Sequence, residues 1–209
     1  MAQTKLNATL GMSGNLPALN GSSLTNLPAA NLTGTLPAIS GANLTGIAGI
    51  DGVQIWNMTT AFQGQGSPNY GNLVTNWSSS APTNGIGTPL VGTAPVTESS
   101  GIFSFTSTGF YLIKFTCSWA DNSGADKDIF ANIKATKNNS TYNLAARAGQ
   151  ALTEASSYRS ATATTLLDIT DLTNQKVMFG AGSVETSTYV YGHGTYQHTY
   201  ALFWRLGDT

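Results

Sequence analysis

The chain has 209 residues, enough for one sizeable domain with an appendage or for two small domains. Charged residues make up 9% of it and the formal net charge is −1, whereas globular proteins carry about 25% charged residues. Nucleic acid and anionic membranes require clustered Lys and Arg, so we expect neither as a partner. No run of about 18 apolar residues marks a membrane span, and the start, MAQTKLNATLGMSG, lacks the apolar core of a secretory signal.

The first segment, Leu16 to Gly46, is an uncharged sequence that nearly repeats itself three times. Its Leu and Ile residues are spaced alternately three and five residues apart, with one compression. This eight-residue period fits neither an α-helix nor a heptad coiled coil, and Pro17, Pro28 and Pro37 also disfavour a helix. The pattern predicts short extended pieces joined by turns, each with one apolar residue that points the same way.

A single strip of this kind cannot bury its own Leu side chains or offset the entropy of ordering it. Identical strips wound around a common axis share one core, in which charge is costly. We therefore predict a β-structured stalk over residues 13–50, preceded by a segment, residues 1–12, that breaks the spacing. The alternative is a flexible linker, which favours Gly, Ser or charge over regularly spaced Leu. The predicted contacts between strips include Leu16, Leu24, Leu32 and Leu44.

From residue 51 onward the sequence predicts strands throughout. Alternation is clearest in GFYLIKFTCSWA, in which one face carries Tyr111, Ile113, Phe115, Cys117 and Trp119. Turn-forming clusters separate further strands, and one segment, Gly149–Ala155, fits a short helical turn. Many short strands at this spacing predict an all-β sandwich or jelly roll. The other predicted strands are Asp51–Met58, Gly101–Phe105, Ile129–Ala135, Thr141–Ala146, Thr162–Ile169, Lys176–Gly182, Thr188–Tyr191 and Thr199–Leu206.

The loop ADNSGADKD is the best candidate for a metal site. Asp121, Asp126 and Asp128 supply hard oxygen ligands, and Gly124 permits the turn that would direct them at calcium. Loops of Asp, Asn and Gly are also common as solvated turns. Both interpretations stay open, and we expect no other cofactor.

The sequence does not favour catalysis. A glycosidase needs two carboxylates that face each other across a sugar, and the only cluster of Asp residues lies in one loop. The chain has no Gly-x-Ser-x-Gly elbow and no His-Glu-x-x-His motif. Cys117 shares a strand face with Phe115 and Trp119, which favours a core thiol over a nucleophile. We expect that the protein is not an enzyme.

Three motifs carry a resemblance to a known family. The run GIF, followed eight residues on by GFY, resembles the signature of the complement-type globular heads of the tumour-necrosis-factor (TNF) superfamily, with Ile113 in place of its last Phe. ATTLLDITDLTNQKVMFGAG is similar to a hairpin of these heads. TYALFWRLGD is similar to their closing strand, with Tyr200 and Phe203 at the aromatic positions and Leu202 in place of the usual Gly. The resemblance covers residues 51–209.

The resemblance implies a ten-stranded TNF-like jelly roll that forms a tight trimer around aromatic-rich inner strands. It places Tyr111, Ile113 and Phe203 at the subunit interface. The LPAxxxANLTG repeat resembles the stems of phage fibres and related virion appendages. We therefore predict a homotrimeric fibre, with residues 1–12 attached to other virion proteins, a stalk over 13–50 and a head over 51–209.

On this prediction the fibre assembles in the host cytoplasm, lies on the virion surface and recognises a host-surface glycan or protein. Two alternatives stay open. The first is a structural decoration or cement trimer on the capsid, with no receptor. The second is a secreted bacterial adhesin, which the missing export signal disfavours.

The loop YVYGHGTYQHT is the predicted contact with the host. In a jelly roll of this kind both termini lie at the stalk end, and the last strand spans roughly 25 Å at about 3.3 Å per residue. The loop before it therefore lies at the distal end. Aromatic side chains offer a large contact area at low entropy cost. The predicted binding residues are Tyr191, His193, Tyr196 and His198, and the alternative is that their rings pack within the head.

Overall fold

The structure is a computed structural model that describes residues 52–63, 71–81, 89–121, 129–151, 158–182 and 188–209. These residues all belong to the second of two units into which the chain divides, Gly46–Thr209. The predicted attachment segment and stalk lie outside the described residues. So do the predicted stalk contacts Leu16, Leu24, Leu32 and Leu44.

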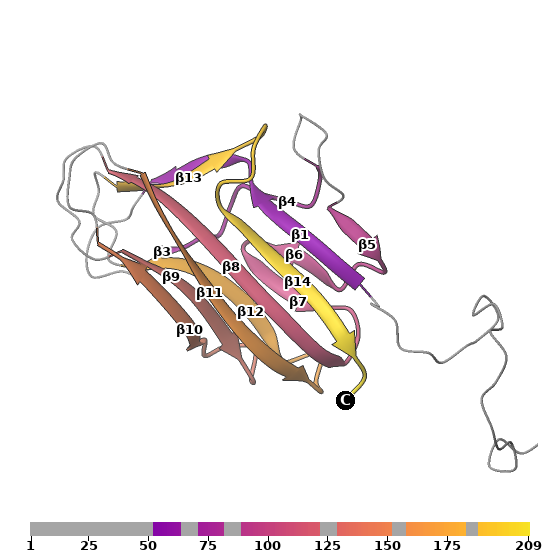
Figure 1. Cartoon of the computed structure of the whole chain (residues 1–209). Coiled ribbons are helices and arrows are strands. Elements are labelled where there is room, and N and C mark those ends of the chain that lie inside the picture. Colours follow the sequence, from indigo (N-terminus) through magenta and orange to yellow (C-terminus); the bar gives the residue numbers. More distant parts are fainter. Residues whose placement is uncertain (1–51, 64–70, 82–88, 122–128, 152–157, 183–187) are drawn as a thin grey trace, which may run out of the picture. The chain divides into compact units, whose positions relative to one another are not determined.

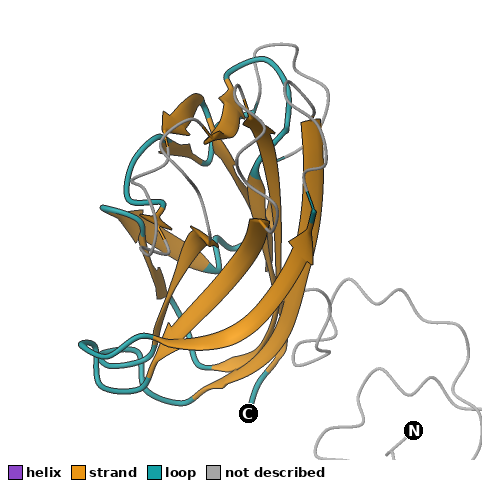
Figure 2. Cartoon of the chain, turned by 90° about the vertical axis from the view of Figure 1, so that its left-hand side faces the viewer, coloured by secondary structure: helices purple, strands orange, loops and turns teal. Residues whose placement is uncertain are grey.

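The described residues form fourteen strands and no helix, so no described helix is available to span a membrane. The strands make two antiparallel sheets that lie against each other as two layers (Figure 1, Figure 2). The eight-stranded sheet contains β1 (Gly52–Met58), β2 (Thr60–Gln63), β4 (Trp77–Ser78), β5 (Leu90–Gly92), β8 (Gly109–Asp121), β11 (Tyr158–Ile169), β13 (Thr188–His193) and β14 (Tyr200–Gly207). The six-stranded sheet contains β3 (Gly71–Asn72), β6 (Val96–Ser99), β7 (Ile102–Phe105), β9 (Ile129–Thr136), β10 (Asn143–Gln150) and β12 (Lys176–Gly182).

The predicted strands are present, with differences at their ends. β12 has the predicted bounds, whereas β11 begins at Tyr158, four residues before the prediction. The suggested helical turn does not begin at Gly149, because Gly149 and Gln150 pair with β9 as part of β10. The rest of that suggestion, residues 152–155, lies outside the described residues. The ten strands implied by the resemblance are also too few. The additional strands include β2, β3, β4 and β5, of two to four residues each.

The core lies between the two sheets and is dominated by aromatic rings. Phe103 of β7 is fully buried at its centre. Its ring contacts Trp56, Trp77, Phe179 and Phe203 at centroid distances of 5.1 to 5.6 Å, in edge-on or tilted arrangements that aromatic pairs favour. These residues come from both sheets, so a single ring joins the two layers.

Three residues predicted at the subunit interface lie in this core instead. The side chains of Tyr111, Ile113 and Phe203 have no exposed surface within the single chain. They cannot contact another subunit, and that prediction is wrong. Successive residues of a strand point to opposite faces, so the residues between them carry the outward side of the same strands.

The two glycines of the GIF and GFY motifs have backbone conformations that other residues rarely adopt. Gly101 has a φ of 77° and Gly109 a φ of 140°. A Cβ atom at residue 101 would lie 2.5 Å from the carbonyl oxygen of Leu73, and one at residue 109 would collide with the carbonyl oxygen of Gly207. Both positions therefore require glycine.

Replacing Gly109 with alanine is expected to lower the free energy of unfolding by about 1–3 kcal/mol from backbone strain, with the Gly207 collision adding to that loss. Urea unfolding followed by Trp fluorescence measures it. Gly71→Ala is the matched control, because a Cβ there meets its nearest atoms at 3.8 Å. Equal midpoints for the two variants would contradict this explanation of the motif.

Both ends of the described head lie at one end of the sandwich (Figure 1). Gly52 at the start of β1 is the register partner of Arg205 near the end of β14. Arg205 is 9% exposed, and its Nε and Nη2 donate hydrogen bonds to the carbonyl oxygen of Thr108 at 3.0 and 2.7 Å. It also forms an ion pair with Asp208.

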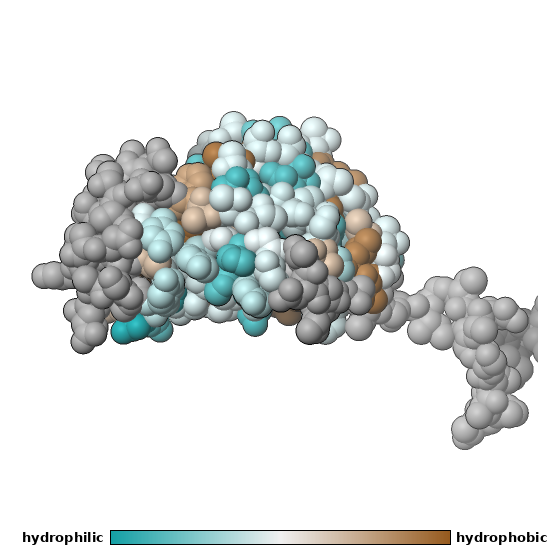
Figure 3. All heavy atoms as spheres, turned by 90° about the horizontal axis from the view of Figure 1, so that it is seen from above, coloured by the Kyte–Doolittle hydropathy of each residue, from teal (hydrophilic) through white to brown (hydrophobic). Residues whose placement is uncertain are grey.

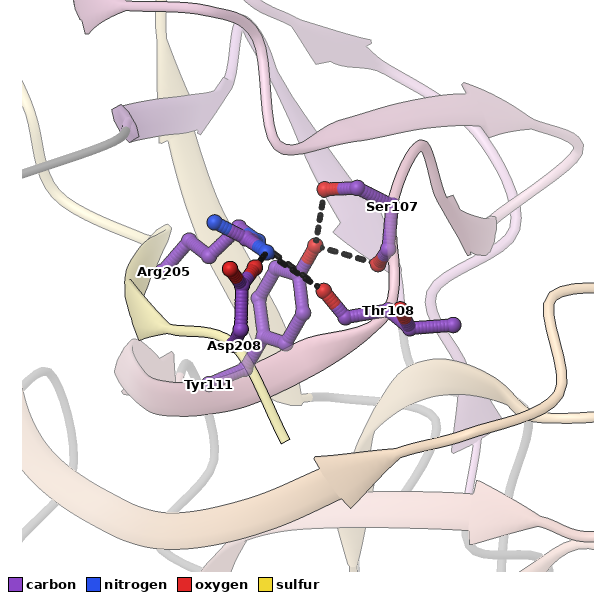
Figure 4. A network of polar contacts seen from close by, with 5 residues as sticks. All are labelled: Ser107, Thr108, Tyr111, Arg205 and Asp208. Atoms are coloured by element: carbon purple, nitrogen blue, oxygen red, sulfur yellow. Dashed lines mark hydrogen bonds and ion pairs between the residues drawn. The ribbon is translucent and has the colours of Figure 1, made fainter. Parts of the chain in front are cut away.

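Beside this ion pair, Tyr111 donates to the carbonyl oxygen of Ser107 at 2.7 Å (Figure 4). The polar contacts at this end therefore hold the end of β14 against the segment that leads into β8. The connection between β13 and β14 lies at the opposite end of β14, as the sequence predicts.

Candidate interaction surface

The outer face of the eight-stranded sheet carries a continuous line of apolar side chains across five strands. Leu166 of β11 pairs with Leu112 of β8, which pairs with Trp204 of β14. Trp204 in turn pairs with Val53 of β1, and Val53 with Val91 of β5. Pairing in register places these side chains next to one another on one face. We call this line of Leu166, Leu112, Trp204, Val53 and Val91 the apolar row.

The apolar row is partly open to solvent in the single chain. Leu166 is 57% and Val91 52% exposed, and the three residues between them are half-buried. Phe110 and Leu206 lie beside the row and are also exposed. Figure 3 shows hydrophobic atoms in separate brown patches among pale and teal ones, in the view from above. Partly exposed apolar side chains that lie next to one another, rather than singly, are typical of an interaction surface.

Away from the chain ends, the same face becomes polar. The next pair of outward residues along β8 and β11, Lys114 and Thr164, is followed by Thr116 and Thr162, whose hydroxyls lie 2.9 Å apart. Ser118 and Ser160 follow, with hydroxyls 2.7 Å apart. These hydroxyl pairs separate the apolar row from the far end of the sheet.

Six aromatic rings gather at that far end. Tyr191 contacts Tyr158, Tyr189 and His198 at centroid distances of 5.6, 6.0 and 4.6 Å. His193 stacks on Tyr196 at 5.2 Å and lies 6.1 Å from His198. The structure therefore brings the four predicted binding residues together. We call Tyr158, Tyr189, Tyr191, His193, Tyr196 and His198 the aromatic cluster.

The position of β13 explains why the cluster forms. Tyr189, Tyr191 and His193 alternate with buried residues along β13, so they share its outer face. Gly192 lies between them and approaches the backbone of Thr60 in β2 so closely that a Cβ would collide with it. Position 192 must therefore be glycine for β2 and β13 to pair. The loop that follows then returns over the sheet, where the hydroxyl of Ser118 donates to the carbonyl oxygen of His198 at 2.8 Å.

Sequence reasoning missed one member of the cluster, Tyr158, whereas Tyr189 is the first residue of the predicted contact loop. Their backbone partner is the same residue, Ala120 of β8, which pairs with β11 on one side and β13 on the other. Only this register brings Tyr158 next to a loop some thirty residues further along the chain. No spacing in the sequence could have indicated it.

The two histidines have distinct local contacts. The Nδ1 of His193 accepts a hydrogen bond from the backbone N–H of Thr195 at 3.0 Å. The pKa of His198 is lowered, first because burial removes water from the imidazolium and second because His193 lies nearby. The other ionisable groups in ring contact with His198 are Tyr191 and Tyr196.

The head is expected to lose stability in acid through His198. Because the pKa of His198 is lowered in the folded chain, folding favours its neutral form. The stability that His198 contributes is therefore fully present above its pKa in the unfolded chain, near 6.5. It is lost as the pH falls through the lower folded value. Urea unfolding at pH 7.5 and 5.0 should show a smaller difference in His198→Gln than in the wild type. Equal differences in the two proteins would contradict this assignment.

Two further predictions concern the calcium loop and Cys117. Asp126, Asp128 and the side chain of Asp121 lie outside the described residues, so the calcium loop stays a prediction. Cys117 is fully buried among the core residues, as predicted, and burial raises the pKa of its thiol. A thiol held neutral and away from solvent is a poor nucleophile.

The sheets and their order define a TNF-like jelly roll, and comparison with solved structures supports this fold. Murine APRIL matches with a TM-score of 0.51 and 12% identity over 74% of this chain and 98% of that one. Eiger TNF from S. frugiperda matches with a TM-score of 0.53 and 12% identity over 75% of this chain and 93% of that one. No protein-family model matches the sequence, and no curated protein matches it. The predicted TNF-like fold of the head is confirmed.

Proposed function

We propose that the chain is the subunit of a homotrimeric virion fibre whose head recognises the host surface. The observation that carries the proposal is the apolar row, which crosses five strands of one sheet and is partly open to solvent in the single chain. Covering exposed apolar side chains with another subunit removes them from water, which is favourable. The resemblance to TNF-superfamily heads makes a trimer the favoured arrangement.

The unusual N-terminal sequence supports a fibre rather than a free trimer. The uncharged repeat from Leu16 to Gly46 spaces its apolar residues so that several chains would share them. A stalk of this kind places the head at its tip, with residues 1–12 available for attachment to other virion proteins. The end of the head where β1 begins would then face the stalk.

The aromatic cluster is the proposed contact with the host. It lies at the opposite end of the sheet from Gly52, so on a stalk it would point outward. Two of its rings, Tyr158 and Tyr196, are more than half exposed. Rigid aromatic side chains on the open end of a stable scaffold are typical of binding surfaces.

Replacing His193, Tyr196 and His198 together with alanine is expected to abolish adsorption of particles to host cells. The triple variant removes half of the rings but leaves the apolar row untouched, so its trimer should stay intact. Adsorption is measured by counting free particles after mixing with cells, and Leu172→Ala serves as a control on a distant exposed turn. Unchanged adsorption by an intact triple variant would favour a structural decoration trimer instead.

A further inference from the structure

We propose that the aromatic cluster binds a neutral carbohydrate, and that Tyr158 and Tyr196 are the rings on which the sugar stacks. The inference rests on the proposed host-recognition function and names the chemical class of its partner. It also adds Tyr158, which lies outside the loop that the sequence singles out.

The two outermost rings of the cluster are open yet held in place by other rings. Tyr158 is 63% exposed and contacts Tyr191 edge to face, with an interplanar angle of 84°. Tyr196 is 56% exposed and stacks on His193 with an interplanar angle of 30°. Each ring therefore presents surface to solvent with little freedom to lose on binding, which favours affinity.

The polar groups around these rings suit hydroxyl ligands. Because the Nδ1 of His193 accepts the Thr195 hydrogen bond, a neutral imidazole carries its proton on Nε2 and is a donor there. Tyrosine hydroxyls both donate and accept. A sugar ring matches this mixture, since it combines an apolar C–H face with hydroxyls that donate and accept at its rim. The aromatic faces would pack against the C–H face of the sugar, and the polar atoms would hydrogen-bond its hydroxyls.

The same contacts favour a neutral sugar over an anionic one. Among the described residues, the ring contacts within the cluster join only Tyr and His side chains to each other. Recognition of a sugar carboxylate or phosphate commonly uses Arg or Lys. The neighbouring Arg159 pairs in register with Trp119, whose side chain is in the core, so its side chain leaves β11 on the other face of the sheet. Its Nη1 donates a hydrogen bond to the backbone carbonyl oxygen of Tyr158 at 2.9 Å.

The full-length protein is applied to an array of neutral and acidic bacterial polysaccharides. We expect binding to neutral glycans, a loss of at least tenfold in Tyr158→Ala, and retention of most binding in Tyr158→Phe, which keeps the ring. Tyr142→Ala is the matched control, because Tyr142 lies in the β9–β10 connection outside the cluster. Binding confined to acidic glycans, binding independent of Tyr158, or no binding to any glycan would overturn the inference.

A second measurement separates this inference from the proposed function. Host cells are treated either with periodate, which destroys sugar diols, or with a protease, and particle adsorption is then measured. Loss after periodate alone supports a carbohydrate partner. Loss after protease alone, with adsorption still dependent on Tyr158, overturns the carbohydrate inference and retains host recognition. Adsorption that no cluster variant affects overturns both. A Tyr158→Ala protein that no longer forms trimers would also overturn it, because the cluster would then be a subunit contact.

Discussion

Replacing Phe103 with alanine is expected to lower the free energy of unfolding by about 3–5 kcal/mol, which is the usual cost of removing a fully buried phenylalanine. Phe103 has no exposed surface and contacts four other aromatic rings from both sheets. Its removal leaves a cavity that those rings cannot fill without leaving their own contacts. Because whole domains are stable by about 5–15 kcal/mol, this single change is a large fraction of the total.

Urea unfolding followed by circular dichroism measures the effect of Phe103→Ala. Phe130→Ala is the matched control, since Phe130 is half-buried on β9 and its ring contacts the guanidinium of Arg147 at 4.7 Å. An exposed contact of this kind is worth about 0.5–1 kcal/mol. Similar losses in the two variants would contradict the central place of Phe103 in the core.

Replacing Leu112 with aspartate is expected to weaken the trimer by at least two orders of magnitude without unfolding the head. Leu112 lies in the middle of the apolar row, between Leu166 and Trp204. In a trimer that covers this row, three unpaired carboxylates would be moved out of water, at a cost of several kcal/mol each. A change of about 1.4 kcal/mol already alters an equilibrium constant tenfold.

A dilution series in the ultracentrifuge measures this weakening. Leu172→Asp is the matched control, because Leu172 is exposed in the connection between β11 and β12, away from the row. Circular dichroism verifies that both variants keep the β fold. Trimers of equal strength in the two variants would show that the subunits meet elsewhere.

The sequence predicts the long strands well because each alternates apolar and polar residues over eight or more positions, or is bounded by clear turns. For β8 two predictions conflict. The strand pattern places Phe115, Cys117 and Trp119 in the core, whereas the resemblance places Tyr111 and Ile113, on the same face, at the subunit interface. The opposite face is also apolar at this end of the strand, with Phe110 and Leu112. In the structure Tyr111 and Ile113 lie in the core. The exposed residues are their neighbours along the strand, such as Phe110, so the interface prediction was displaced by one residue.

Other features depend on contacts between distant segments. The strands β2 to β5 are two to four residues long and have no period to detect. The loop with Tyr191 and His193 stands out by composition, and its place at the far end follows from the direction of the last strand. Tyr158 joins it only through the pairing of β11 and β13 with the same stretch of β8. Registers of this kind are set by the whole fold.

Sedimentation equilibrium of the full chain at micromolar concentration tests the central proposal most directly. The proposed trimer predicts a single species with three times the chain mass of 21.8 kDa, which dissociates more readily when Leu112 is replaced with aspartate. A folded species with the mass of one chain, stable with its apolar row in water, would contradict the trimer and with it the proposed fibre.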